Sequence, residues 1–68
     1  MVKEFSIGKN VRKYRTKKSL SQEDLSRKSG VKYTTLTKIE SNVIKAPSVL
    51  VMAKIAKTLG VSIENLLK

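Results

Sequence analysis

Residues 21–40 read SQEDLSRKSGVKYTTLTKIE, and this stretch decides the fold. Ser21 opens it, and its hydroxyl can accept a hydrogen bond from the amide three residues on, whose acidic side chain can reach back as in a capping box. Gly30 permits the left-handed backbone that ends a helix. Leu36 and Ile39 then share the inner face of a second helix. Two short helices joined by a tight turn containing glycine predict a helix-turn-helix.

The flanking sequence repeats the same pattern: a small polar residue that can cap a helix, then apolar residues at helical spacing, then Gly or Asn. It predicts five helices, at about 7–18, 22–29, 32–41, 49–59 and, after Ser62, a short fifth one. In the fourth helix, the residues expected to face inward are Val49, Met52, Ala53, Ala56 and Leu59. Such short helices must pack on each other. We therefore expect an all-α, compact five-helix bundle, as one domain over 1–68 with a short N-terminal arm at 1–6.

The composition excludes several classes of function. The 68 residues contain no Cys and no His, which removes disulfides, thiol nucleophiles and the commonest metal ligands and general bases. Among the five acidic residues, Glu23 and Asp24 occupy a helix start. No nucleophile–base pair, phosphate-cradling glycine loop or metal constellation is visible, so we expect no enzyme, no metal and no cofactor.

The charge balance points to a polyanionic partner. Fifteen Lys and Arg residues oppose five acidic ones, for a net charge of +10. Nucleic acid and an anionic membrane surface both fit that charge. The membrane surface is an alternative because the first helix is basic and amphipathic. Dense helix capping favours a globular domain over a membrane peptide. No apolar run approaches the length of a signal peptide or a membrane span, so we expect a cytoplasmic, nucleoid-associated protein without membrane contact.

Beyond the central stretch, the segments IGKNVRKYR, LTKIESN and PSVLVMAKIAKTLGVSIENLL extend the pattern over about residues 7–67. Together with LSQEDLSRKSGV they resemble the XRE/Cro (phage-repressor-like) family of DNA-binding domains. The resemblance implies that Gln22, at the start of the second helix, bonds a DNA phosphate. It implies that Arg15 and Glu40 form a structural ion pair between the first and third helices. The alternative for Gln22 is an exposed polar residue near a helix start.

The outward positions of the third helix are expected to read bases in the major groove. They are Lys32, Tyr33, Thr34, Thr37 and Lys38. The loop that follows is expected to contact phosphates through Ser41, Asn42 and Lys45. Many family members carry Ser or Thr where this chain has Lys32, a cation that opposes the helix dipole and forfeits a cap bond. A nearby phosphate or guanine would explain it, and so would simple cover of the amides by water. Asn10, Arg12 and Lys13 are expected to form a solvated outer face on the first helix.

Members of the family commonly dimerise on two half-sites, which gives a palindromic operator. Candidate dimer contacts are Leu50, Val51, Ile63 and Leu67. The alternative is that the fifth helix only completes the core. The expected function is a sequence-specific double-stranded DNA-binding transcriptional regulator acting as a homodimer. The alternative is an antitoxin or other protein-interaction module with the same fold, since adjacent exposed apolar residues indicate a contact patch.

Overall fold

The computed structural model describes residues 6–68 and contains five consecutive α-helices there. They are α1 (Ile7–Lys17), α2 (Gln22–Ser29), α3 (Tyr33–Glu40), α4 (Val49–Leu59) and α5 (Ile63–Leu67). The predicted all-α, five-helix fold is confirmed, and each predicted helix end lies within one residue of the observed one. Residues 1–5 of the predicted N-terminal arm lie outside the described residues.

Helix ends are fixed by the residues that the sequence marks. At α2, the Asp24 amide donates to Ser21 Oγ (3.0 Å) and the Ser21 amide donates to Asp24 Oδ2 (3.1 Å), which completes a capping box. The backbone hydrogen bond from Ser21 is the largest cause that lowers the pKa of Asp24 below its ordinary value of 3.8. Gly30 ends the helix with φ of 79°, in the left-handed region. The hydroxyls of Ser48 and Ser62 cap α4 and α5 by accepting from the amides of Val51 and Asn65 (both 3.2 Å).

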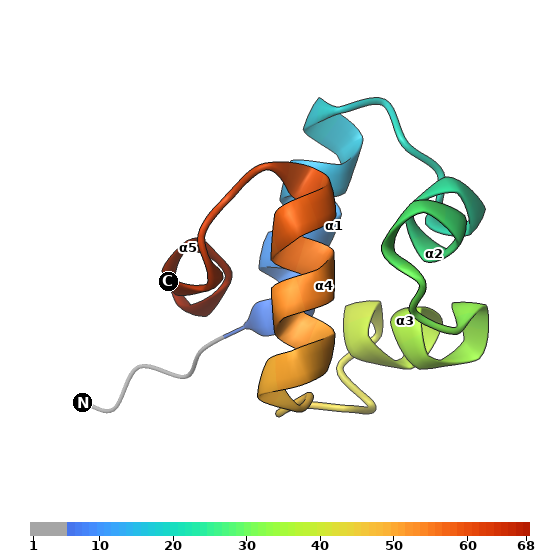
Figure 1. Ribbon diagram of the computed structural model, residues 1–68. Coiled ribbons are helices and arrows are strands. Elements are labelled where there is room, and N and C mark those ends of the chain that lie inside the picture. The colour runs from blue at the N-terminus through green and yellow to red at the C-terminus, as the bar shows by residue number, and fades with distance from the viewer. Residues whose placement is uncertain (1–5) are drawn as a thin grey trace.

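All five helices contribute to one hydrophobic core. Its fully buried large side chains are Val11, Leu25, Leu36, Ile39, Ile55, Leu59 and Leu66. Figure 1 shows α4 crossing in front of α1, with α2 and α3 on one flank and α5 on the other. The α2–α3 pair packs on both α1 and α4, so its orientation is set by helices distant in sequence. No helix within residues 6–68 has the length and apolar character needed to traverse a lipid bilayer.

One predicted core position is wrong. Val49 was expected to face inward, but its side chain is 74% exposed. The buried side of α4 is instead formed by Met52, Ile55, Ala56 and Leu59. Val49 is the first residue of α4 and directly follows its N-cap, Ser48. The spacing of apolar residues identifies which face of a helix is buried, but it does not show how far along that face other segments cover it.

A close backbone approach joins the start of α1 to the end of α3. Gly8 is buried, and a Cβ added there would overlap the carbonyl oxygen of Ile39 and would come within 3.1 Å of Glu40 Cα. Only a residue without a side chain lets the two helices meet at this separation. This contact holds the C-terminal end of α3 against α1, and it was not predicted from the sequence.

Candidate functional site

Side chains and backbone groups of α2 fix the turn between α2 and α3. The Ser26 hydroxyl donates to the carbonyl of Val31, and the Val31 amide donates to Ser29 Oγ (3.2 Å). The Gly30 amide donates to the carbonyl of Ser26 (2.9 Å). Val31 is buried just after the turn. The start of α3 is therefore held at a defined angle to α2.

The outward face of α3 carries most of the predicted base-reading residues. Lys32, Tyr33, Thr34 and Lys38 are exposed, and Thr37 is half-buried. The Thr37 hydroxyl donates to the carbonyl of Thr34 (2.8 Å), so its oxygen remains an acceptor for an external donor. Lys32 occupies the N-cap position and makes no side-chain cap bond, as its identity predicts. The helix that follows the turn thus presents cationic, hydroxyl and phenol groups at one surface.

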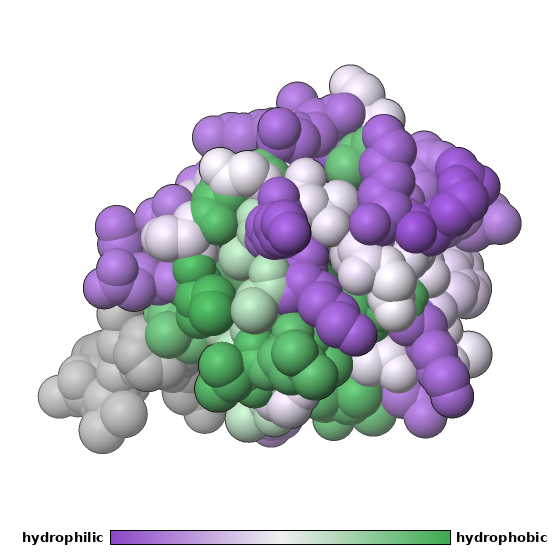
Figure 2. Space-filling model, viewed as in Figure 1, coloured by the Kyte–Doolittle hydropathy of each residue, from purple (hydrophilic) through white to green (hydrophobic). Residues whose placement is uncertain are grey.

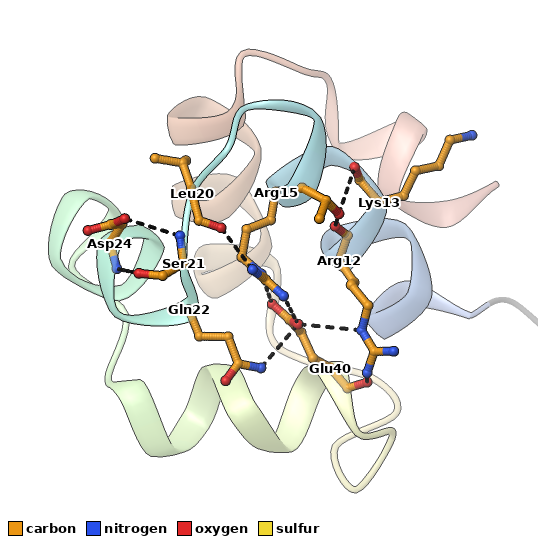
Figure 3. A network of polar contacts seen from close by, with 9 residues as sticks. Arg12, Lys13, Arg15, Leu20, Ser21, Gln22, Asp24 and Glu40 are labelled. Carbon is orange, nitrogen blue, oxygen red and sulfur yellow. Dashed lines mark hydrogen bonds and ion pairs between the residues drawn. The ribbon is translucent and has the colours of Figure 1, made fainter.

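Glu40 is the buried centre of the polar network in Figure 3. Its side chain is 1% exposed. Arg15 donates from Nε to Oε2 (2.7 Å) and from Nη2 to Oε1 (2.9 Å), a bidentate pair between α1 and α3. The Nη1 group of Arg15 also donates to the carbonyl of Leu20 (2.8 Å), in the α1–α2 connection. The pair therefore fixes the relative positions of α1, α3 and the start of α2.

Two further side chains meet the Glu40 carboxylate. Gln22 donates from Nε2 to Oε1 (3.1 Å), and Arg12 brings Nε to 3.8 Å from the same oxygen. Arg12 Nη2 also donates to the Glu40 carbonyl (3.4 Å). Gln22 is thus oriented by the network and is not simply a solvent-exposed residue. Arg12 was expected on a solvated face; its spacing of three from Arg15 puts both on one side of α1, a signal that could have revealed the contact.

The predicted phosphate-contacting loop lies at the C-terminal end of α3. Ser41, Asn42 and Lys45 are all exposed there. Asn42 has φ of 64°, the left-handed conformation expected after a helix. The amides of Val43 (2.8 Å) and Ile44 (3.0 Å) both donate to the carbonyl of Lys38, which folds the loop back on the helix. These residues and the outward face of α3 form one continuous stretch of exposed polar groups.

Asn10 corrects another expectation. It was predicted to belong to a solvated face, but its side-chain amide donates to the carbonyls of Leu66 (2.8 Å) and Lys68 (3.0 Å). That amide satisfies carbonyl groups at the end of α5, which lack partners within the helix. Asn10 therefore ties α1 to α5 and is a structural residue, whereas Lys13 is exposed as predicted.

The four candidate dimer contacts differ in exposure. Leu50 is 67% exposed, whereas Val51, Ile63 and Leu67 are partly buried against the core. Figure 2 shows apolar side chains gathered over the start of α4 and extending toward α5. Exposed Val43 and Val49 lie in the adjoining segments. Ile63 and Leu67 therefore pack on the core and remain partly exposed.

Comparison with known proteins identifies the class. A family described as Helix-turn-helix matches residues 11–66, which is most of the chain. The chain belongs to this helix-turn-helix family, of the XRE/Cro type that the sequence resembles. Among curated proteins, it is 36% identical over 61 residues to the HTH-type transcriptional regulator SinR of Bacillus subtilis and equally to that of Bacillus licheniformis. The match covers 90% of this chain but 55% of SinR, so the chain spans about half the length of these relatives.

Solved structures agree with this assignment. The master regulator for biofilm formation SinR, crystallised in complex with DNA, matches with a TM-score of 0.89 and 35% identity, over 91% of this chain and 98% of that one. SinR in a SinR–SinI complex matches with a TM-score of 0.88 and 35% identity, over 91% of this chain and 60% of that one. The restriction-modification controller protein C.AhdI from Aeromonas hydrophila matches with a TM-score of 0.83 and 29% identity, over 91% and 92%. SinR is thus described as a transcriptional regulator and C.AhdI as a controller protein.

Proposed function

We propose that this protein binds double-stranded DNA in a sequence-specific manner and regulates transcription, with α3 in the major groove. The observation that carries the proposal is the exposed polar face of α3, which follows a helix-turn-helix turn. A net charge of +10 supplies the electrostatic attraction to a phosphate backbone. The similarity to the structure of SinR in complex with DNA also supports DNA binding by this protein.

Within this proposal, Lys32, Tyr33, Thr34, Thr37 and Lys38 contact base edges. Lysine donates to guanine O6 and N7, and threonine can bond a base edge or touch a thymine methyl. Gln22 contacts a phosphate with the Nε2 hydrogen that Glu40 leaves free. Ser41, Asn42 and Lys45 contact the backbone at the other end of α3. Arg15 and Glu40 hold these elements in register and touch no DNA.

The proposed regulator acts in the cytoplasm as a homodimer on an inverted repeat. The apolar surface that includes Leu50, Val51, Ile63 and Leu67 supports this arrangement, because a two-fold interface uses the same patch on both copies. Two copies would place their α3 helices about one helical turn of DNA apart.

The first test is selection of bound duplexes from a random library at near-physiological salt, where counterion-driven binding is weak. We expect enrichment of an inverted repeat. A single short motif without a repeat would contradict the dimer and leave specific binding intact. Salt-sensitive binding without enrichment would contradict the sequence-specific function.

Two variants assign the contacts on the selected duplex. Lys38→Ala should relax preference at one or two base pairs, and Gln22→Ala should weaken binding equally on all duplexes. An unchanged preference profile would remove Lys38 from the base-reading set, and a sequence-selective loss in Gln22→Ala would contradict its phosphate role.

A second candidate function is a protein-interaction module such as an antitoxin. The exposed apolar residues Val43, Val49 and Leu50 favour it, and SinR itself is found in a complex with SinI. The two functions are compatible within one chain. Val49→Ser separates them, because Val49 is exposed but is not one of the proposed homodimer contacts. It should weaken a complex with a second protein and leave binding to the inverted repeat unchanged.

A further inference from the structure

A polar cleft lies beside α3, at the junction of α1 with the α3–α4 loop. Its volume is about 360 Å³, and it is lined by Ser6, Lys9, Arg12, Glu40, Ser41 and Asn42. The cleft is on the α1 side of the end of α3, whereas Gln22 approaches the same region from α2. Figure 3 shows Arg12 and Gln22 reaching Glu40 from opposite sides. The cleft is therefore separate from the predicted Gln22 contact.

The charges in the cleft favour an anion. Lys9 and Arg12 are three residues apart on α1, on one side of the helix. Within residues 6–68, Lys9 forms no ion pair. Arg12 is 61% exposed and makes only long contacts with Glu40, at 3.4 and 3.8 Å. The Glu40 carboxylate is already neutralised by the short bidentate pair with Arg15, so the cations of the cleft remain available.

Hydrogen-bond donors complete the lining. The Ser6 hydroxyl makes no helix-cap bond, and the Ser41 hydroxyl makes only a long bond to the carbonyl of Lys38 (3.3 Å). The left-handed backbone at Asn42 folds the loop so that its exposed amide borders the cleft. Two cations together with uncharged donors match the oxygens of a phosphodiester, which carry one negative charge and accept several hydrogen bonds.

We propose that this cleft binds one backbone phosphate of the DNA duplex, outside the base pairs that α3 reads. The inference rests on the proposed function, and it extends the phosphate contact proposed for Ser41 and Asn42 to Lys9 and Arg12 of α1. Ser41 and Asn42 line the cleft and directly follow α3, so the cleft adjoins the end of the proposed base-reading helix. Arg12 links the two regions, because it lines the cleft and contacts the carboxylate that orients Gln22.

The test compares two double variants that lose the same charge. Lys9→Gln/Arg12→Gln removes the cations of the cleft, and Lys54→Gln/Lys57→Gln removes two exposed cations of α4. The probes are a duplex with the selected site, the same duplex with mismatched bases, and the selected duplex with one neutral methylphosphonate at each flanking position in turn. Binding is measured as a function of salt concentration.

The cleft variant should bind matched and mismatched duplexes about 10-fold more weakly than wild type, and its salt slope should fall by about 0.9, as expected for one lost phosphate contact. The α4 variant should change the affinity and the salt slope much less. One flanking methylphosphonate should weaken wild type but not the cleft variant. Equal behaviour of the two double variants would overturn the inference while leaving DNA binding intact; a wild-type protein that binds no duplex would overturn both.

Arg12 also contacts Glu40, so an effect of its substitution on folding must be distinguished from an effect on phosphate binding. Lys9→Gln alone leaves that contact in place; it should keep the wild-type melting temperature and still weaken duplex binding about 3-fold. Wild-type affinity in this single variant, together with a lowered melting temperature in the double variant, would show that Arg12 acts only on the fold and would overturn the cleft as a phosphate site.

Discussion

The two ends of α3 differ in burial and in the contacts that they make. The C-terminal end is buried: Ile39 meets Gly8 of α1, and the Glu40 carboxylate receives three donors from α1 and α2. The N-terminal end is exposed and begins at Lys32, without a side-chain cap. One end holds the helix in the domain, and the other leaves its polar groups free for an external partner.

The start of α2 sharpens this contrast. Both α2 and α3 contain eight residues, but α2 begins with a complete capping box. Capping stabilises a helix by about 1 kcal/mol, so α3 forgoes that stabilisation at its start. The bidentate pair and the close helix contact at its other end compensate. The buried contacts of α3 are thus concentrated at its C-terminal end, whereas exposed polar side chains, Lys38 among them, follow its outward face.

The largest effect is expected from Gly8→Ala. The new methyl group would overlap the Ile39 carbonyl, and neither backbone can move without disturbing the core. We expect a loss of about 3 kcal/mol in the free energy of unfolding, measured by urea denaturation. Gly30→Ala is the matched control: no atom lies within 4 Å, so only its φ of 79° is penalised, by about 1 kcal/mol. Equal losses in the two variants would contradict the close contact.

Glu40→Gln tests the polar part of the same end. The substitution keeps the size of the side chain but leaves the guanidinium of Arg15, whose side chain is 14% exposed, without its counter-charge. We expect a loss of about 2 kcal/mol in the free energy of unfolding. The double variant Arg15→Gln/Glu40→Gln should lose less than the sum of its single variants. Strict additivity would mean that the pair does not couple α1 to α3.

Ser21→Ala tests the capped start of α2. We expect a loss of about 1 kcal/mol in the free energy of unfolding at about pH 7. Because the folded protein lowers the pKa of Asp24, the associated stabilisation is present above the ordinary value of 3.8 and is lost as the pH falls through the lowered value. The Ser21 amide that lowers this pKa remains in Ser21→Ala, so the pH dependence is tested with Asp24→Asn. Thermal unfolding across this range should show a smaller pH dependence in Asp24→Asn than in wild type; the same dependence in both would contradict the hydrogen bond between Asp24 and Ser21.

The smallest effect is expected from Lys32→Ser, and it has the opposite sign. Serine at the N-cap position of α3 can accept a bond from a first-turn amide and removes an unfavourable cation, so the free energy of unfolding should rise by about 0.5 kcal/mol. Duplex binding should weaken at the same time. A stabilised variant with unchanged affinity would show that Lys32 is not part of the reading surface.

The sequence alone determined the elements and their limits. Ser21, Gly30, Ser48 and Ser62 specify helix ends through local bonds and local backbone freedom, so they can be read without the fold. The buried positions Leu36 and Ile39 follow from periodicity, and the outward residues of α3 follow from them. The XRE/Cro resemblance added the pairing of Arg15 with Glu40, which lie far apart in the chain.

Only the tertiary structure decided which side chains are buried, and which residues they contact, where this depends on how the helices pack on one another. It exposed Val49 despite its favourable spacing, and it used Gly8 to bring α1 onto α3. It also brought Asn10 into contact with the end of α5, and it placed the exposed Arg12 within reach of Glu40 beside the cleft. Local patterns fix the direction in which a side chain points, but the surface it meets is set by segments distant in sequence, whose positions follow from packing of the whole core.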